Sequence, residues 1–271
     1  MTNNPPVDLT ERFNLKVAGP EGGQPMLFAH GFGCDQNMWR YVAPRFENRF
    51  RVILFDYPGH GGTPVPEGDI DRYSTLAAYA SDLLEIVRTL DLNDVIFVGH
   101  SVSSMIGVLA AVEEPERFDR LVLVGPSPRY IDEDGYSGGF QRADIEELLE
   151  SLESNYLGWS SAMAPVIMGV PERPELGREL EASFCRTDPG IARRFAHATF
   201  FSDNRQDLPK APLPALVLQC RNDAIAPVSV GRFVAEALPG GSLVLLDATG
   251  HCPHLSMPEE TVKAIEKFVG A

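Results

Sequence analysis

The sequence predicts an α/β protein with a mostly parallel, doubly wound sheet, and three features of its 271 residues support this fold class. First, short runs of consecutive apolar residues indicate strands that are buried on both faces, as in a parallel sheet covered by helices. Second, amphipathic stretches of helix length separate these runs, and such alternation is typical of βαβ units. Third, one long segment without strand-like runs interrupts the alternation. The predicted strands are residues 25–29, 52–55, 95–98, 121–124, 215–218 and 243–246.

The helices between these strands and in the interrupting segment follow from apolar residues at helical spacing. Those between the strands are predicted at residues 35–46, 73–90, 101–112, 228–238 and 257–269. Those of the interrupting segment are predicted at residues 142–156, 157–168, 173–185 and 189–201. Because ligands bind at the carboxyl ends of the strands in such sheets, we expect this segment to form a cap there. The predicted organisation is a core of residues 1–125 and 213–271 with a four-helix cap of residues 126–212.

The composition excludes several function classes. The formal net charge of −15 argues against a nucleic-acid partner, because such a partner requires a basic face. No apolar run approaches the roughly 18 residues of a membrane span, and the first residues lack the regions of a secretion signal, so we expect a cytoplasmic protein. The cysteines show no CxxC or metal-ligand spacing, which predicts buried free thiols. They are Cys34, Cys185, Cys220 and Cys252.

The segment VIFVGHSVS, residues 95–103, carries the strongest chemical signal. A buried strand meets a helix through Gly99 and Ser101, which is the pattern of a nucleophile elbow. The usual pattern G-x-S-x-G here ends in Ser103, so we expect either a slightly looser strand–helix crossing or a local hydrogen bond of that hydroxyl. The alternative interpretation is a turn in which the serine only caps the helix.

A serine hydroxyl needs a base that takes its proton. In a sheet of this kind the acid and the base follow the last two strands, in the order Ser…Asp…His. Asp223 and His251 occupy these places, so Ser101, His251 and Asp223 are the predicted catalytic triad of an α/β-hydrolase fold. Three nearby residues are weaker alternatives or neighbours: Asp247 as the acid, His254 as a structural residue, and His100 as a packing residue of the elbow.

Acyl transfer also needs donors for the oxyanion. The backbone N–H of Val102, at a helix N-terminus, is one predicted donor. The other is the N–H of Phe32, because Gly31 and Gly33 on either side let the backbone turn toward the serine. The alternative here is a plain glycine-rich turn. No phosphate-binding glycine motif is present, and we expect neither a cofactor nor a metal.

Seven motifs carry a resemblance to a known family. They are GFGCDQNMW (31–39), DRYSTL (71–76), GHSVSSMIG (99–107), PSPRY (126–130), GGF (138–140), FFSDNR (200–205) and GHCPH (250–254). On these the chain resembles the bacterial RsbQ-type stress-signalling hydrolases and the karrikin and strigolactone receptors of plants. The resemblance implies a V-shaped four-helix cap over a narrow hydrophobic pocket lined by Phe32, Phe140, Trp159 and Phe200. It further implies slow hydrolysis and, for the RsbQ type, a phosphatase partner that carries a PAS domain.

Two hypotheses about function follow. The first is an enzyme that hydrolyses a small apolar ester or lactone through an acyl-enzyme on Ser101. The second is a sensor that binds or slowly hydrolyses a small apolar ligand and signals to a protein partner. Other reactions of this fold that use an aspartate nucleophile do not fit, because the elbow carries Ser101.

Overall fold

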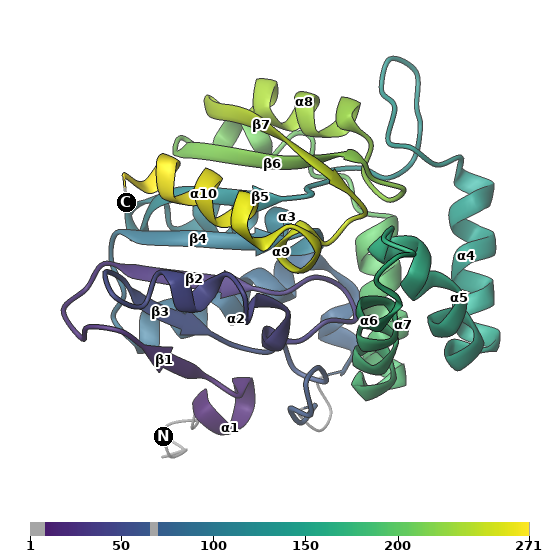
Figure 1. The fold of residues 1–271 in the computed structure, drawn as a ribbon, viewed down its shortest axis with the longest axis horizontal. Helices are drawn as coiled ribbons and strands as arrows, with labels where there is room; N and C mark the ends of the chain where they lie inside the picture. Colours follow the sequence, from purple (N-terminus) through teal and green to yellow (C-terminus); the bar gives the residue numbers. More distant parts are fainter. Residues whose placement is uncertain (1–8, 66–69, 271) are drawn as a thin grey trace.

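The computed structural model describes residues 9–65 and 70–270. Within them the chain forms a seven-stranded sheet of order β1-β3-β2-β4-β5-β6-β7, and Figure 1 shows its strands running side by side through the molecule. The first strand pairs antiparallel with β3, and all the other pairs are parallel. The strands are β1 (Lys16–Ala18), β2 (Pro25–Ala29), β3 (Arg51–Leu54), β4 (Val95–His100), β5 (Phe118–Val124), β6 (Pro214–Asn222) and β7 (Gly240–Thr249). The predicted α/β fold class is therefore confirmed.

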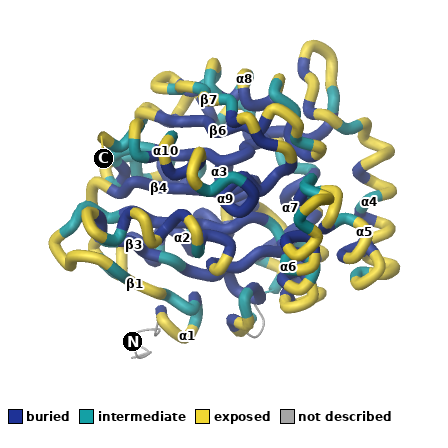
Figure 2. Tube along the Cα trace, viewed as in Figure 1, coloured by how far each residue is buried: buried dark blue, intermediate teal, exposed yellow. Residues whose placement is uncertain are grey.

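Helices cover both faces of the sheet. They are α1 (Leu9–Phe13), α2 (Leu76–Thr89), α3 (Val102–Glu113), α4 (Arg142–Ser154), α5 (Tyr156–Met168), α6 (Pro174–Arg186), α7 (Pro189–Phe200), α8 (Val228–Ala237), α9 (Pro253–Ser256) and α10 (Pro258–Val269). Because successive side chains of a strand point to opposite faces, β2 contributes to two cores. Leu27 packs in the core that contains α2, α3 and α8, whereas Met26 and Phe28 pack in the core that contains α10. Figure 2 shows the central strands buried along their length.

The four helices between β5 and β6 are α4 to α7, and Figure 1 shows them together at one end of the sheet, beyond the carboxyl ends of the strands. Their apolar side chains form a third core with residues of the loops below. Two of these helices begin with proline at the first turn, as the sequence predicts; they are α6 and α7. The exact division into core and cap at residues 126 and 212 stays a prediction.

Three expectations were wrong in detail. Residues 35–46 form two short 3-10 turns, Gln36–Trp39 and Ala43–Arg45, instead of one helix, because Pro44 lacks the N–H that a continuing helix needs. The antiparallel edge strand β1 was not predicted; it is only three residues long and none of them is buried. Cys185 is exposed on α6, whereas the other three cysteines are buried. All four thiols are free.

Other short 3-10 turns are Ile70–Ser74, Pro115–Arg117 and Leu208–Lys210. Among residues 9–65 and 70–270, no helix has both the length and the apolar character needed to cross a membrane.

Candidate active site

Ser101 lies at a sharp turn between β4 and α3. Its backbone has φ +55° and ψ −123°, a conformation that non-glycine residues rarely adopt and that is found mainly at functional sites. The turn is held by the Ser101 N–H, which donates to the Val124 carbonyl at 2.8 Å. A Cβ on Gly99 would lie 2.7 Å from the Ser103 carbonyl oxygen, so glycine is needed where strand and helix cross. The Ser101 side chain makes no capping bond to α3, which contradicts the interpretation as a simple helix cap.

The hydroxyl of Ser103 is hydrogen-bonded locally, which is one of the two adjustments expected at this position. It donates to the His30 carbonyl at 2.5 Å and lies 3.0 Å from the Tyr57 hydroxyl. All three groups are buried. The serine thus ties the elbow to the loop that follows β2.

Replacing Ser103 by alanine should lower the free energy of unfolding by about 2 kcal/mol, because it leaves a buried carbonyl and a buried phenol without this partner. Urea denaturation measures the change. Ser81→Ala is the control, since the Ser81 hydroxyl bonds only its own helix at an exposed site and its loss should change stability by less than about 0.5 kcal/mol. Equal effects of the two substitutions would show that the Ser103 bonds do not stabilise the elbow.

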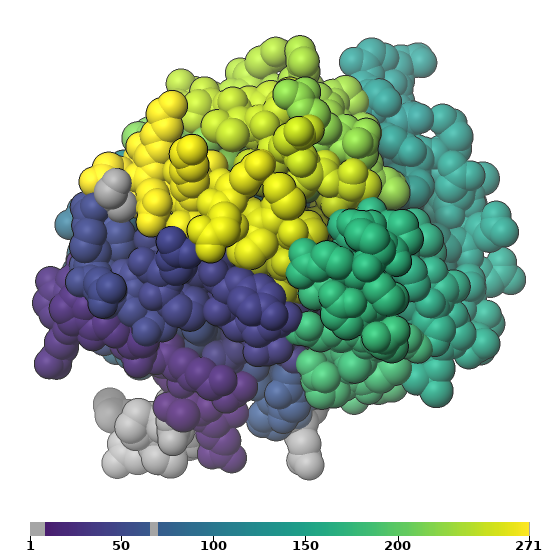
Figure 3. All heavy atoms as spheres, viewed as in Figure 1, coloured from purple at the N-terminus to yellow at the C-terminus, as the bar shows by residue number. Residues whose placement is uncertain are grey.

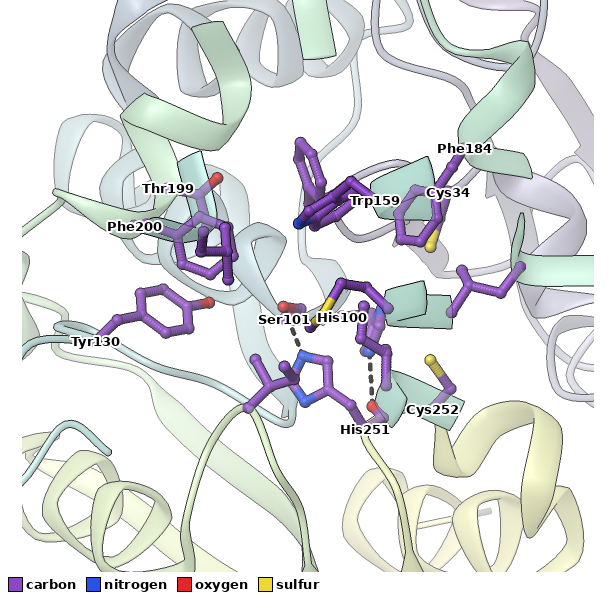
Figure 4. A pocket seen from close by; sticks show the side chains of 16 residues that line it. Cys34, His100, Ser101, Tyr130, Trp159, Phe184, Thr199, Phe200, His251 and Cys252 are labelled. Atoms are coloured by element: carbon purple, nitrogen blue, oxygen red, sulfur yellow. Dashed lines mark hydrogen bonds between the residues drawn. The ribbon is translucent and has the colours of Figure 1, made fainter. Parts of the chain in front are cut away.

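His251 connects Ser101 to Asp223. Its Nε2 lies 2.7 Å from the Ser101 Oγ, a bond that Figure 4 shows, and its Nδ1 lies 2.8 Å from the Asp223 Oδ2. Since a carboxylate only accepts, the Nδ1 carries the proton and the Nε2 is free to accept one from the serine. The side chains of His251 and Asp223 are only 5 % and 1 % exposed, so water does not compete for these bonds.

The loop after β6 orients Asp223. Its Oδ1 accepts from the N–H groups of Ile225 and Ala226 at 2.8 and 3.1 Å. Its Oδ2 faces His251 and lies 3.3 Å from the Gln219 amide nitrogen. The carboxylate is therefore held from several sides with one oxygen directed at the histidine.

The alternative residues lie elsewhere. The Asp247 side chain is 87 % exposed and faces Arg221 at 3.6 Å, so it does not contact His251. His254 is buried and packs on the ring of Trp39. His100, which also packs on His254, donates from its Nε2 to the His251 carbonyl at 2.9 Å. Both histidines thus take the packing positions that the sequence indicates.

The two amides that were predicted to face an oxyanion belong to segments that lie next to Ser101. Val102 begins α3, and the first N–H groups of a helix have no partner inside it. The loop with Phe32 is close to the nucleophile, because a Cβ on Gly31 would lie 3.3 Å from the Ser101 Cβ. Gly33 has φ +66°, and a Cβ there would overlap the Phe184 ring. Gly33 thus has a backbone conformation that suits the predicted turn, and close packing leaves no room for a side chain at either glycine.

A narrow cavity opens beside the Ser101 hydroxyl, beneath the cap (Figure 4). Its volume is only about 40 Å³. The walls are apolar except for a few groups, and Phe32, Trp159 and Phe200 line it as the resemblance implies. The complete lining is Phe32, Cys34, His100, Ser101, Tyr130, Leu148, Trp159, Met163, Ile167, Leu180, Phe184, Thr199, Phe200, Ile225, His251 and Cys252.

Phe140 is not among the residues that line this cavity, so its predicted role as a pocket residue is wrong. Its backbone N–H donates to the Tyr130 carbonyl at 3.1 Å, and its ring packs half-buried on the outside of the cap core. Phe140 therefore supports the strand-like segment that carries Tyr130, whose side chain does reach the cavity.

Several lining residues were not predicted as pocket residues, above all Tyr130, Phe184 and Ile225. The first two are aromatic residues of the predicted cap segment 126–212. Aromatic residues in helical segments usually pack in a core, and spacing alone does not show which of them line a pocket. Burial raises the pKa of the Tyr130 phenol, so it stays protonated and can donate a hydrogen bond.

The cavity also holds two thiols and lies next to a group of metal-ligand residue types. Burial raises the pKa of the Cys34 and Cys252 thiols, which makes them poor nucleophiles. Within the described part of the chain, His100, Cys252 and His254 bring one ligand atom each within 4.8 Å of one another. The Nε2 of His100 is hydrogen-bonded to the His251 carbonyl, so one ring nitrogen of this group already has a backbone partner.

The fold, the strained serine turn and the bonded histidine define a class of hydrolases. The chain belongs to the alpha/beta hydrolase family, whose model matches residues 26–264. It is 36 % identical over 260 residues to the karrikin insensitive 2 receptor CA of Petunia hybrida, with 96 % of each chain covered. It is 37 % identical over 260 residues to the strigolactone esterase RMS3 of Pisum sativum, with 95 % of this chain and 97 % of that protein covered. The resemblance to karrikin and strigolactone receptors is therefore confirmed.

A solved structure agrees with this assignment. The fold matches that of a hydrolase from Oleispira antarctica with a TM-score of 0.93 and 42 % identity, covering 97 % of this chain and 96 % of that chain.

Proposed function

We propose that the protein is a serine hydrolase that cleaves small hydrophobic esters or lactones through an acyl-enzyme. The observation that carries this proposal is the unbroken chain of hydrogen bonds from Ser101 through His251 to Asp223. In this chain Ser101 is the nucleophile, His251 the general base and Asp223 the residue that fixes the histidine tautomer.

The chemistry follows from the geometry. The Ser101 oxygen attacks the carbonyl carbon while its proton passes to the His251 Nε2. The carbonyl oxygen becomes an oxyanion, which the N–H groups of Val102 and Phe32 stabilise. When the intermediate collapses, the bond to the alcohol oxygen breaks and His251 returns the proton to that oxygen, leaving the acyl group on Ser101. Water then repeats the sequence, and the carboxylic acid leaves as the serine regains its proton.

The cavity limits the substrate. Its walls are mostly apolar. No lysine or arginine is among the described residues that line it, so it offers no cationic side chain to bind an anionic substrate. Its small volume favours a short or flat acyl group. One relative is named a strigolactone esterase, which supports ester hydrolysis as the reaction.

A fluorophosphonate probe tests the nucleophile directly, because it forms a covalent bond with an activated serine. We expect one label per chain, located at Ser101 by peptide mass spectrometry, and none on Ser101→Ala. Ser104→Ala is the matched control, since it removes a buried hydroxyl of the same helix start whose bond goes to the Gly99 carbonyl. Labelling of Ser101→Ala equal to the wild type would contradict the proposal.

A second candidate function is a ligand sensor that uses the same site. The specific observation in its favour is the narrow, mostly apolar cavity beneath the cap, which suits the binding of a small apolar ligand. The predicted partner is a phosphatase with a PAS domain, and the cap presents the exposed apolar side chains of Leu157 and Val166 to such a partner. Leu157→Glu should then abolish signalling and leave turnover intact. Unchanged signalling in a set of such cap-surface variants would contradict this role.

A further inference from the structure

The last turn of α5 contacts the loop that holds His251. The His251 backbone N–H donates to the Ile167 carbonyl at 2.8 Å. Ile167 is the second-last residue of α5, and the last four carbonyls of a helix accept no hydrogen bond from within that helix. The end of this cap helix is thus completed by the amide of the proposed general base. In Figure 3 the green cap meets the yellow C-terminal segment along a continuous border.

Two facing glycines make this close approach possible. Gly169 ends α5 in the left-handed conformation, with φ +67°, and a Cβ there would lie 2.6 Å from the Cα of Gly250. Gly250 has φ +92°, and a Cβ there would overlap the Met168 carbonyl. The two backbones therefore touch without room for a side chain on either.

The other backbone groups around His251 are also held. Its carbonyl accepts from the His100 Nε2 at 2.9 Å, and the N–H of Gly250 donates to the Asn222 carbonyl at 2.7 Å. The backbone of His251 is thus fixed by the elbow on one side and by the cap on the other. Both bonds of its ring, to Ser101 and Asp223, depend on this placement.

We propose that α5 positions the general base, with Gly169 as a positioning residue for hydrolysis and the Ile167 carbonyl as the group that holds the His251 amide. This inference rests on the proposed function, because it assigns a task to the residue proposed as the base. A side chain at position 169 would push the cap and the histidine loop apart, and a misplacement of about 1 Å at a catalytic group costs about 100-fold in rate.

Gly169→Ala tests this, and the chain offers a matched control. Gly270 ends α10 with φ +73°, and nothing lies within 4 Å of a Cβ there. Alanine at either position meets the same backbone strain, but only position 169 has the contact with Gly250. We expect kcat for p-nitrophenyl acetate to fall about 100-fold in Gly169→Ala, with KM changed less than about threefold because binding groups are not removed. Gly270→Ala should keep the wild-type kcat.

A second pair of variants separates the effect of the contact with Gly250 from that of backbone strain. Asparagine tolerates the left-handed conformation better than alanine but still carries a Cβ, so Gly169→Asn should lose kcat while Gly270→Asn does not. Circular dichroism and melting temperature show whether each variant is folded. The inference is wrong if folded Gly169 variants keep the kcat of their Gly270 counterparts. The proposed function fails separately, if the wild-type chain shows no fluorophosphonate label on Ser101.

Discussion

Asp223→Asn is expected to lower kcat for ester hydrolysis by about 10⁴-fold, a loss typical of a triad in which the histidine takes the wrong tautomer. The Oδ1 of Asp223 accepts from two backbone N–H groups. An asparagine should keep its oxygen there and turn its NH₂ group toward His251. Since that group donates, the His251 Nδ1 must accept, and its Nε2 then carries the proton and cannot take one from Ser101. Steady-state kinetics with p-nitrophenyl acetate measures the loss.

Asp247→Asn is the matched control for this variant. It makes the same chemical change four residues before His251, at a side chain that is exposed and near Arg221, so kcat should stay within about twofold of the wild type. His251→Ala and the double variant with Asp223→Asn should be equally slow, because residues that act as a unit are not additive. Retention of more than a tenth of the wild-type kcat by Asp223→Asn would exclude Asp223 as the orienting acid.

The parts of the site that could be predicted from the sequence are those set by chain order. Ser101, Asp223 and His251 each follow a strongly apolar run, and parallel strands bring their carboxyl ends to one edge of the sheet. The strand boundaries moved by a few residues, but each residue remained just beyond its strand. The sequence also indicated that Gly99 lets strand and helix approach and that Gly31 and Gly33 let the backbone turn at Phe32. The structure leaves no room for a side chain at any of these three positions.

The residues that could not be predicted are those whose side-chain direction depends on the packing of distant segments. Phe140 and Tyr130 lie on two paired stretches before α4, and nothing in the spacing indicates which ring faces the cavity. The helix predicted over residues 35–46 rested on apolar spacing alone, and spacing does not show that Pro44 breaks it. The contact between Gly169 and Gly250 joins positions 81 residues apart, and no local pattern indicates it.

Acidification from pH 7.5 to pH 5.5 is expected to lower the free energy of unfolding by about 5 kcal/mol, because four buried histidines stay neutral in the folded state. Burial lowers the pKa of His30 to about 4 and that of His60 and His254 to about 3. The pKa of His100 is also lowered by burial, and by the neighbouring histidines His254, His251 and His30. In the unfolded chain each has its ordinary pKa near 6.5 and takes up a proton as the pH falls.

The sign follows from proton uptake. Below about pH 6.5 the unfolded state binds more protons than the folded state, so stability present at pH 7.5 is lost as the pH falls. Each histidine contributes about 1.4 kcal/mol between the two pH values. Asp82 acts in the opposite direction, because burial raises its pKa to about 6, but it offsets less than about 1 kcal/mol. The net loss is a large part of the 5 to 15 kcal/mol that stabilises a typical domain.

Urea denaturation at the two pH values measures this loss, and one histidine variant identifies its source. In the folded chain His254 is fully buried, and among the described residues neither ring nitrogen has a hydrogen-bond partner. His254→Leu removes one titrating group, so it should reduce the pH-dependent loss by about 1.4 kcal/mol. His197→Gln is the control, because the His197 side chain is 47 % exposed and faces Glu153; it should not reduce the loss. If stability is equal at pH 7.5 and 5.5, the four buried histidines take up protons in the folded protein, and their pKa values are not lowered there.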